Sequence, residues 1–148
     1  MVKSYQFRQA PGHLIRRAHQ ISVGIFMEEL VAFDVTPVQF AILNTVMDTP
    51  GVDQVTLANR VAFDAATSGS VIGRLEAKGW VRREADEQDR RRKLLWVTPE
   101  GEQVVAGMKR GVGRTQQRLL APLSPDEQAQ LMGLLGRLVQ GHEDAVAD

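Results

Sequence analysis

Apolar side chains recur every three or four positions along most of the chain, which is the spacing of an amphipathic α-helix. This pattern predicts a long first helix over residues 11–32, a second over 36–48 and a shorter third over 53–62. The last third of the chain, residues 99–148, predicts two more helices. The protein is therefore expected to be mainly α-helical.

Polar residues mark where several helices should begin. Thr36 and Ser124 each stand directly before a proline and are followed, three positions later, by Gln or Glu, as in a capping box. Thr98 starts a weaker version of the same signal. Asp64 is expected to cap a further helix that continues to Lys78 and stops at Gly79, because the left-handed residue after a helix is usually glycine.

Two segments break the helical pattern. Residues 81–85 and 93–97 predict short strands, joined by a very polar loop. The pair of short helices before them, separated by a break at residues 62–63, is weak evidence alone because helical hairpins are common. Followed directly by a β-hairpin, the pair indicates a winged helix-turn-helix in which the hairpin is the wing.

The end of the chain carries a narrow apolar stripe at positions i, i+3, i+4, i+7 and i+8, formed by Leu131, Leu134, Leu135, Leu138 and Val139. A winged lobe does not need such flanking helices for its own core. We therefore expect the N- and C-terminal helices to pack across the two-fold axis of a homodimer.

The composition excludes several classes of site. The chain has no cysteine, which excludes disulfides, thiolate zinc sites and thiol-based redox sensing. Its three histidines form no cluster in sequence, so a metal site would have to be assembled across two subunits. No stretch approaches the roughly 18 uninterrupted apolar residues of a membrane helix, and the N-terminus lacks the apolar segment of a secretory signal. We expect a cytoplasmic protein without a membrane partner.

Nothing in the sequence resembles an enzyme's active site. There is no Ser-His-acid spacing, no glycine-rich phosphate loop and no pair of carboxylates in an apolar setting. We expect no catalytic residue and no cofactor.

Charge is unevenly distributed although the formal net charge is zero. Residues 56–98 hold nine Lys or Arg against six Asp or Glu, which makes this segment +3 and the remainder −3. The positive excess thus coincides with the predicted helix-turn-helix and wing, where nucleic acid would bind.

The start of the helix capped by Asp64 is slim and polar, as a helix that enters the major groove must be. The candidate DNA contacts here are Thr67, Ser68, Gly69 and Ser70. Each helical glycine costs about 1 kcal/mol relative to alanine, which either close approach to DNA or packing against a neighbouring helix would explain. Arg74 could reach a phosphate or a base edge, or instead pair with Glu76 or Asp64.

Two motifs resemble the MarR family of bacterial transcriptional regulators. The loop with Asp86, Asp89 and Arg91, followed by the strand and residues 97–101, is similar to the family's Asp-Pro-x-Asp-x-Arg, apolar strand and Leu-Thr-x-x-Gly. It departs from that pattern with Glu87 for proline and valine for leucine at position 97. Residues 74–81 are similar to the family's Arg-Leu-Glu-x-x-Gly-Leu-Val at the end of the recognition helix.

The resemblance covers essentially the whole length and implies a single MarR-like domain over residues 1–148. Within it we expect a winged helix-turn-helix lobe over 34–98 and dimerisation helices over 8–33 and 99–146. The resemblance further implies a triangular dimer that presents its recognition helices to successive major grooves of an inverted-repeat operator, with half-sites about 10 base pairs apart. It also implies a pocket between the dimerisation helices and the DNA-binding lobe.

In the wing, Arg91 resembles the family's arginine that enters the minor groove, and we expect Asp89 to hold its guanidinium by a charge-assisted hydrogen bond. Arg90, Arg92 and Lys93 are then candidate phosphate contacts. The alternative is that this basic run is only a solvated hairpin tip.

The first predicted helix carries an unusual polar cluster: His13, Arg16, Arg17, His19 and Gln20. In a family whose pocket is lined partly by the first helix, these residues could bind a small aromatic carboxylate or an acyl-CoA. The alternative is that they pair with Asp or Glu of the partner subunit.

Together these observations predict a sequence-specific DNA-binding transcriptional regulator that binds double-stranded DNA. We expect a repressor that a small anionic or aromatic ligand releases by favouring a DNA-incompetent arrangement of the two lobes. Two alternatives remain: an architectural DNA binder, and a winged-helix protein-interaction module, each without a ligand.

Overall fold

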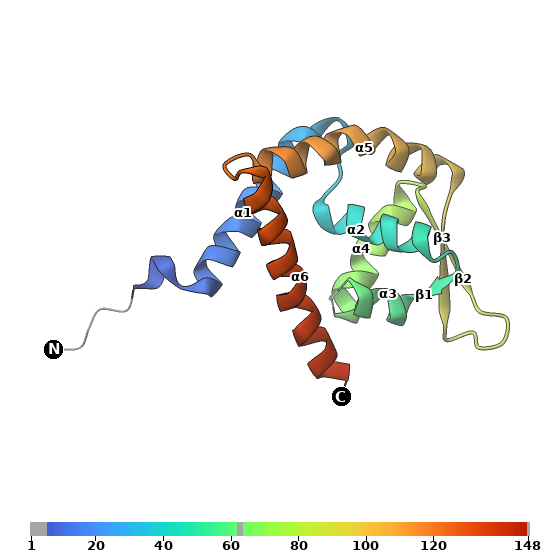
Figure 1. Ribbon diagram of the computed structural model, residues 1–148. Coiled ribbons are helices and arrows are strands. Elements are labelled where there is room, and N and C mark those ends of the chain that lie inside the picture. Colours follow the sequence, from blue (N-terminus) through green and yellow to red (C-terminus); the bar gives the residue numbers. More distant parts are fainter. Residues whose placement is uncertain (1–5, 62–63, 148) are drawn as a thin grey trace.

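The computed structural model describes residues 6–61 and 64–147. These residues form six α-helices and a small antiparallel sheet, with short 3₁₀ turns before and after the first helix (Figure 1). The helices are α1 (Pro11–Glu29), α2 (Pro37–Asp48), α3 (Gln54–Arg60), α4 (Ala65–Ala77), α5 (Pro99–Leu120) and α6 (Pro125–Ala147). The strands are β1 (Val52–Asp53), β2 (Val81–Ala85) and β3 (Lys93–Val97). The expectation of a mainly α protein with a hairpin wing is confirmed.

The predicted helix starts are confirmed by their hydrogen bonds. Thr36 Oγ1 accepts from the Gln39 backbone N–H at 3.2 Å, while the Gln39 side chain accepts from the Thr36 N–H at 3.2 Å. Ser124 forms the same reciprocal pair with Glu127 at the start of α6. Asp64 caps α4, and Gly79 after its end has φ +77°, in the left-handed region.

The first and third helices are shorter than predicted. α1 ends at Glu29 rather than near residue 32, and the chain tightens into a 3₁₀ turn over Val31–Phe33. This turn lets Leu30, only 1% exposed, enter the core before the chain reverses into α2. α3 begins at Gln54 and ends at Arg60, and the predicted break at residues 62–63 lies outside the described residues.

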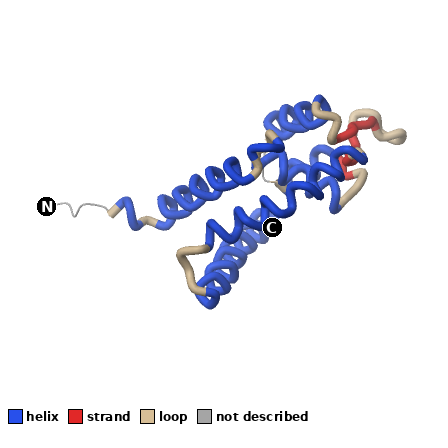
Figure 2. Tube along the Cα trace, turned by 90° about the horizontal axis from the view of Figure 1, so that it is seen from above, coloured by secondary structure: helices blue, strands red, loops and turns tan. Residues whose placement is uncertain are grey.

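The sheet has one strand that the sequence pattern did not predict. Its order is β1-β3-β2, with both neighbours antiparallel to β3. β1 has two residues, too few to show an alternating pattern, and it pairs Asp53 with Leu94. The bounds of β2 and β3 are as predicted. Figure 2 shows the strands gathered at one end of the molecule, opposite the N-terminal end of α1.

The core lies between α2, α3, α4, the sheet and one face of α5, and it includes Ile42, Leu43, Val46, Leu57, Ile72, Leu75, Leu95 and Met108. By contrast, α6 leaves the end of α5 as a separate helix and buries no residue within the chain (Figure 1). Among the described residues, no helix combines the length and the apolar character that a membrane crossing needs.

Candidate nucleic-acid interface

The exposed face of α4 is narrow and polar. Thr67, Ser70 and Arg74 are exposed and follow one another at helical spacings of three and four, so they form one stripe. The Asp64 carboxylate accepts from the Thr67 backbone N–H at 2.8 Å and from its hydroxyl at 2.9 Å. These hydrogen bonds keep the pKa of Asp64 below its ordinary value and fix the start of α4.

Ser68 does not belong to this stripe, and the prediction that it contacts DNA is wrong in this structure. Its side chain is 0% exposed, and its hydroxyl has no hydrogen-bond partner among the described residues. It shares the inner face of α4 with Ile72 and Leu75, which are also buried. Because residues 65–70 are all small, their sequence pattern does not predict which of them faces the core.

Gly69 is half-buried against α3. A Cβ at this position would lie 3.1 Å from Nε2 of Gln54, a tight contact that favours packing against the neighbouring helix as the reason for this glycine. At Gly73, one turn later, an added Cβ would have no heavy atom within 4 Å, so packing within the described chain does not account for this glycine. The two glycines of α4 therefore have different surroundings.

Arg83 links three elements and was not singled out from the sequence. Its guanidinium donates to the Gln54 side chain in α3 at 2.9 Å and forms an ion pair with Glu76 in α4. Since Glu76 is taken by Arg83 and Asp64 caps α4, Arg74 forms no ion pair within the described residues. The alternative that Arg74 pairs with either acid is therefore not observed, and its exposed side chain can meet a partner outside the chain.

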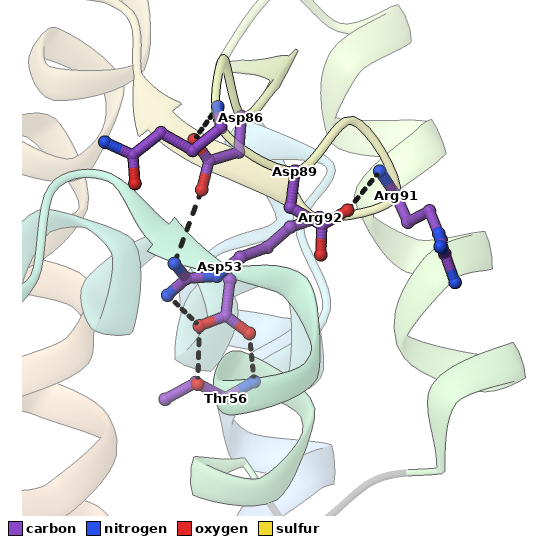
Figure 3. Close-up of polar contacts among 7 residues, drawn as sticks. Asp53, Thr56, Asp86, Asp89, Arg91 and Arg92 are labelled. Atoms are coloured by element: carbon purple, nitrogen blue, oxygen red, sulfur yellow. Dashed lines mark hydrogen bonds and ion pairs between the residues drawn. The ribbon is translucent and has the colours of Figure 1, made fainter.

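The wing tip is organised by backbone hydrogen bonds. Asp89 Oδ1 accepts from the backbone N–H of Arg91 at 3.1 Å, and Asp89 O accepts from the N–H of Arg92 at 2.9 Å. The prediction that Asp89 holds the Arg91 guanidinium is thus wrong: it holds the backbone instead. Figure 3 shows the Arg91 side chain extending away from the surrounding carboxylates. Arg90 and Lys93 are likewise exposed.

Arg92 differs from its neighbours because it is paired within the chain. Its guanidinium lies 3.1 Å from Oδ2 of Asp53 and 3.4 Å from Oδ2 of Asp86 (Figure 3). The pairing with Asp53 raises the pKa of Arg92 further above its ordinary value. The expectation that Arg92 is a free phosphate contact does not agree with this arrangement.

Asp53 is the structural acceptor at the base of the wing. Hydrogen bonds from the hydroxyl and the backbone N–H of Thr56, together with a smaller effect of Arg92, lower the pKa of Asp53 from the ordinary 3.8 to about 2. The Asp53 side chain is only 13% exposed. An aspartate three residues before a threonine is a recognisable capping signal, but its pairing with Arg92 has no local signature.

We expect the stabilisation supplied by the Asp53 carboxylate to be lost in acid. Because its pKa of about 2 in the folded protein is lower than the ordinary 3.8, the contribution is fully present above about pH 5 and declines as the pH falls from about 4 through 2. Urea unfolding of the wild type and Asp53→Asn should differ by about 1–2 kcal/mol at pH 7. That difference should shrink markedly at pH 2.5, and a difference equal at both pH values would contradict this assignment.

The polar cluster of α1 lies on an open face of the chain. His13, Arg16, Arg17 and Gln20 follow helical spacings of three and four and share one side of the helix, with His19 at its edge. Arg17 donates to the Gln20 side chain at 2.6 Å, and the His13 ring packs against Phe7 in a tilted arrangement, with 4.6 Å between the ring centroids. None of the five forms an ion pair within residues 6–61 and 64–147, so an acidic partner would come from outside the chain.

Comparison with known proteins finds the same architecture. A MarR family model matches residues 33–92, from the turn before α2 to Arg92 in the wing. The transcriptional regulator HosA of Escherichia coli O127:H6 is 33% identical over 127 residues, which cover 86% of this chain and 93% of HosA.

Two solved structures extend this likeness to the helices outside the lobe. PcaV from Streptomyces coelicolor, in complex with its natural ligand, is 34% identical with a TM-score of 0.82, covering 93% of this chain and 96% of PcaV. BpsR of Bordetella bronchiseptica, whose DNA binding is regulated by 6-hydroxynicotinic acid, is 32% identical with a TM-score of 0.85, covering 91% of this chain and 96% of BpsR. With relatives above 30% identity matching nearly the full length of both chains, this chain belongs to the MarR family of transcriptional regulators.

Proposed function

We propose that this chain binds an inverted-repeat operator as a homodimer and represses transcription from it. The observation that carries the proposal is the combination of an exposed polar stripe on α4 with unpaired arginines in the wing next to it. Thr67, Ser70 and Arg74 would face the major groove, where arginine suits guanine and small polar residues allow close approach. The positive end of the α4 dipole would favour nearby phosphates.

The wing would supply the second contact. Arg91 extends from a backbone held by Asp89, and an arginine presented in this way can enter a narrow minor groove, where the negative potential is strongest. Arg90 and Lys93 are exposed and would contact phosphates, which fix the register without reading sequence.

The dimer would be formed by the flanking helices. Leu134 (62% exposed), Leu138 (47%) and Val139 (54%) form an apolar stripe on α6, and Leu14 and Ile21 are exposed on α1. Apolar surface of this extent is typical of an interface that a second copy covers. In this division residues 34–98 form the DNA-binding lobe, and 8–33 with 99–146 form the dimerisation helices.

A small aromatic carboxylate would be the releasing ligand. The basic face of α1, where Arg16 and Arg17 are exposed and His13 is half-buried against Phe7, matches a carboxylate. The related BpsR responds to 6-hydroxynicotinic acid, a molecule of that class. A ligand that binds better to a dimer with the wrong lobe spacing would release DNA by population shift. Such a regulator acts in the cytoplasm, where operator and metabolite meet.

The test is a fluorescence-anisotropy titration of the protein against a duplex from the region upstream of its own reading frame. Arg91→Ala should weaken binding to this duplex by about 10–100-fold. A second duplex of unrelated sequence serves as the control and should be bound at least about 1,000-fold more weakly. The association constant should fall steeply with salt, because each neutralised phosphate steepens the plot of its logarithm against the logarithm of the salt concentration by about 0.9.

The other outcomes separate the alternatives. Equal affinity for both duplexes would favour an architectural binder, and no binding at low salt would leave the wing as a protein-docking element. Adding 6-hydroxynicotinic acid, benzoate or an aromatic acyl-CoA to the preformed complex then tests the ligand class. Release that Arg16→Ala or Arg17→Ala prevents would support a site on α1.

A further inference from the structure

The base of the wing meets the first turn of α3, far away in sequence. Asp53, Gln54 and Val55 line a shallow groove together with Arg91, Arg92 and Lys93. We propose that Arg92 is a positioning residue, which ties the wing to the start of α3 through Asp53 and thereby directs Arg91 at the minor groove. This inference rests on the proposed DNA-binding function.

Asp53 is a rigid anchor for this tie. It ends β1, where it pairs with Leu94 of β3, and it caps α3 by accepting from the Thr56 N–H at 2.9 Å and the Thr56 hydroxyl at 2.7 Å. Because Thr56 holds the carboxylate through two hydrogen bonds, β1 holds the backbone and the side chain is little exposed, a group bound to Asp53 is fixed relative to the helix-turn-helix.

On the wing side, Arg92 is fixed through both its side chain and its backbone. The guanidinium bridges Asp53 and Asp86, at 3.1 and 3.4 Å, while the Arg92 carbonyl accepts from the Asp86 N–H at 2.8 Å. Asp89 accepts from the N–H groups of both Arg91 and Arg92. The backbone on which Arg91 stands is therefore held on both sides, while its side chain is exposed (Figure 3).

The contact is better suited to orientation than to stability. The Arg92 side chain is 52% exposed, and ion pairs of that exposure contribute little to folding. The base of the hairpin is held by β1 and by the hydrogen bond from Arg83 to Gln54, but the part beyond the β1 pairing, which carries Arg91, is two-stranded and can tilt relative to the lobe. In the described part of the chain, Arg92 is the residue of the 86–92 loop whose side chain bonds to the start of α3, so it restricts that tilt.

Electrostatics gives two opposite expectations for Asp53. If Asp53 did not position the wing, removing its negative charge beside the DNA would strengthen binding to the phosphates. If it anchors Arg92, the same substitution frees the wing and weakens binding. Asp53→Asn keeps a capping residue at the start of α3, because asparagine is also a good helix cap, so we expect the variant to stay folded despite its lower stability.

The experiment is a double-mutant cycle on operator affinity, with the operator taken from the upstream duplex or selected from a random pool. Asp53→Asn and Arg92→Ser should each weaken binding by about tenfold, and together no more than either alone. In the Asp53→Asn background, Arg91→Ala should weaken operator binding by less than about threefold, whereas in the wild type it should weaken binding by about 10–100-fold. Glu87→Gln is the matched control: it removes an exposed wing carboxylate and should leave affinity unchanged or slightly increased.

Footprinting supplies a readout that a loss of folding would not produce. Hydroxyl-radical protection in the minor groove beneath the wing should be lost in Asp53→Asn, whereas dimethyl sulfate protection of guanine N7 in the major groove should persist. Tighter binding by Asp53→Asn, or additive effects of Arg92→Ser and Arg91→Ala with a salt slope lower by about 1, would overturn the positioning role and make Arg92 a phosphate contact. If the wild type binds none of the duplexes, the proposed function itself fails, and this inference fails with it.

Discussion

The substitution Leu138→Glu should separate the dimer into monomers and abolish operator binding at physiological salt. Leu138 belongs to the apolar stripe of α6, one turn after Leu134, and is 47% exposed in the single chain. A buried leucine contributes about 1.5–3 kcal/mol, and a two-fold interface contains each substitution twice. The added charges must also leave water. The dimer dissociation constant should therefore rise by at least about 100-fold, since 1.4 kcal/mol corresponds to a factor of ten.

Sedimentation velocity measures the dimer directly, and the anisotropy titration measures its consequence for DNA. Ala129→Glu is the matched control, because it adds the same charge to the opposite, exposed face of α6. It should remain dimeric and bind the operator. A Leu138→Glu protein that still sediments as a dimer would place the subunit interface elsewhere. A monomer with undiminished affinity would instead refute the two-site binding model.

The substitution Gly111→Ala should destabilise the fold by about 2–3 kcal/mol, because the added methyl group overfills the contact between α5 and the end of α1. A Cβ there would overlap with Cδ2 of Leu30 and lie 3.2 Å from the Glu29 carbonyl oxygen. Leu30 is 1% exposed and has little room to move. The strain falls beside the ion pairs that Glu29 forms with Arg114 and Arg118, at 2.6 and 2.9 Å.

Gly113→Ala, two residues later on the same helix, is the internal control. Nothing lies within 4 Å of a Cβ at that position, so the variant should gain up to about 1 kcal/mol from the higher helix propensity of alanine. Chemical denaturation at pH 7 gives both values. The opposite result, with Gly111→Ala as stable as the wild type and Gly113→Ala less stable, would mean that α1 and α5 do not pack as described.

Features that depend on residues within one or two turns could be predicted from the sequence. The capping box of Thr36 with Gln39 joins residues three positions apart, and so does the cap of Asp64 with Thr67. The strands of the wing carry their own β pattern, and the arginine-rich loop between them places the basic surface beside α4. These signals are local, and together with the motifs that resemble the MarR family they determined the fold class and the general location of the candidate DNA interface.

The choice among neighbouring residues was decided only by the tertiary structure. Three consecutive arginines, Arg90, Arg91 and Arg92, are chemically identical in the sequence, yet Arg92 alone lies across from Asp53, 39 positions earlier. Likewise, Ser68 turns inward between Thr67 and Gly69 because α4 packs its inner face on the core. Periodicity locates a helix and its faces, but which side chain meets a partner depends on how distant segments are brought together, and that geometry is absent from any local stretch of sequence.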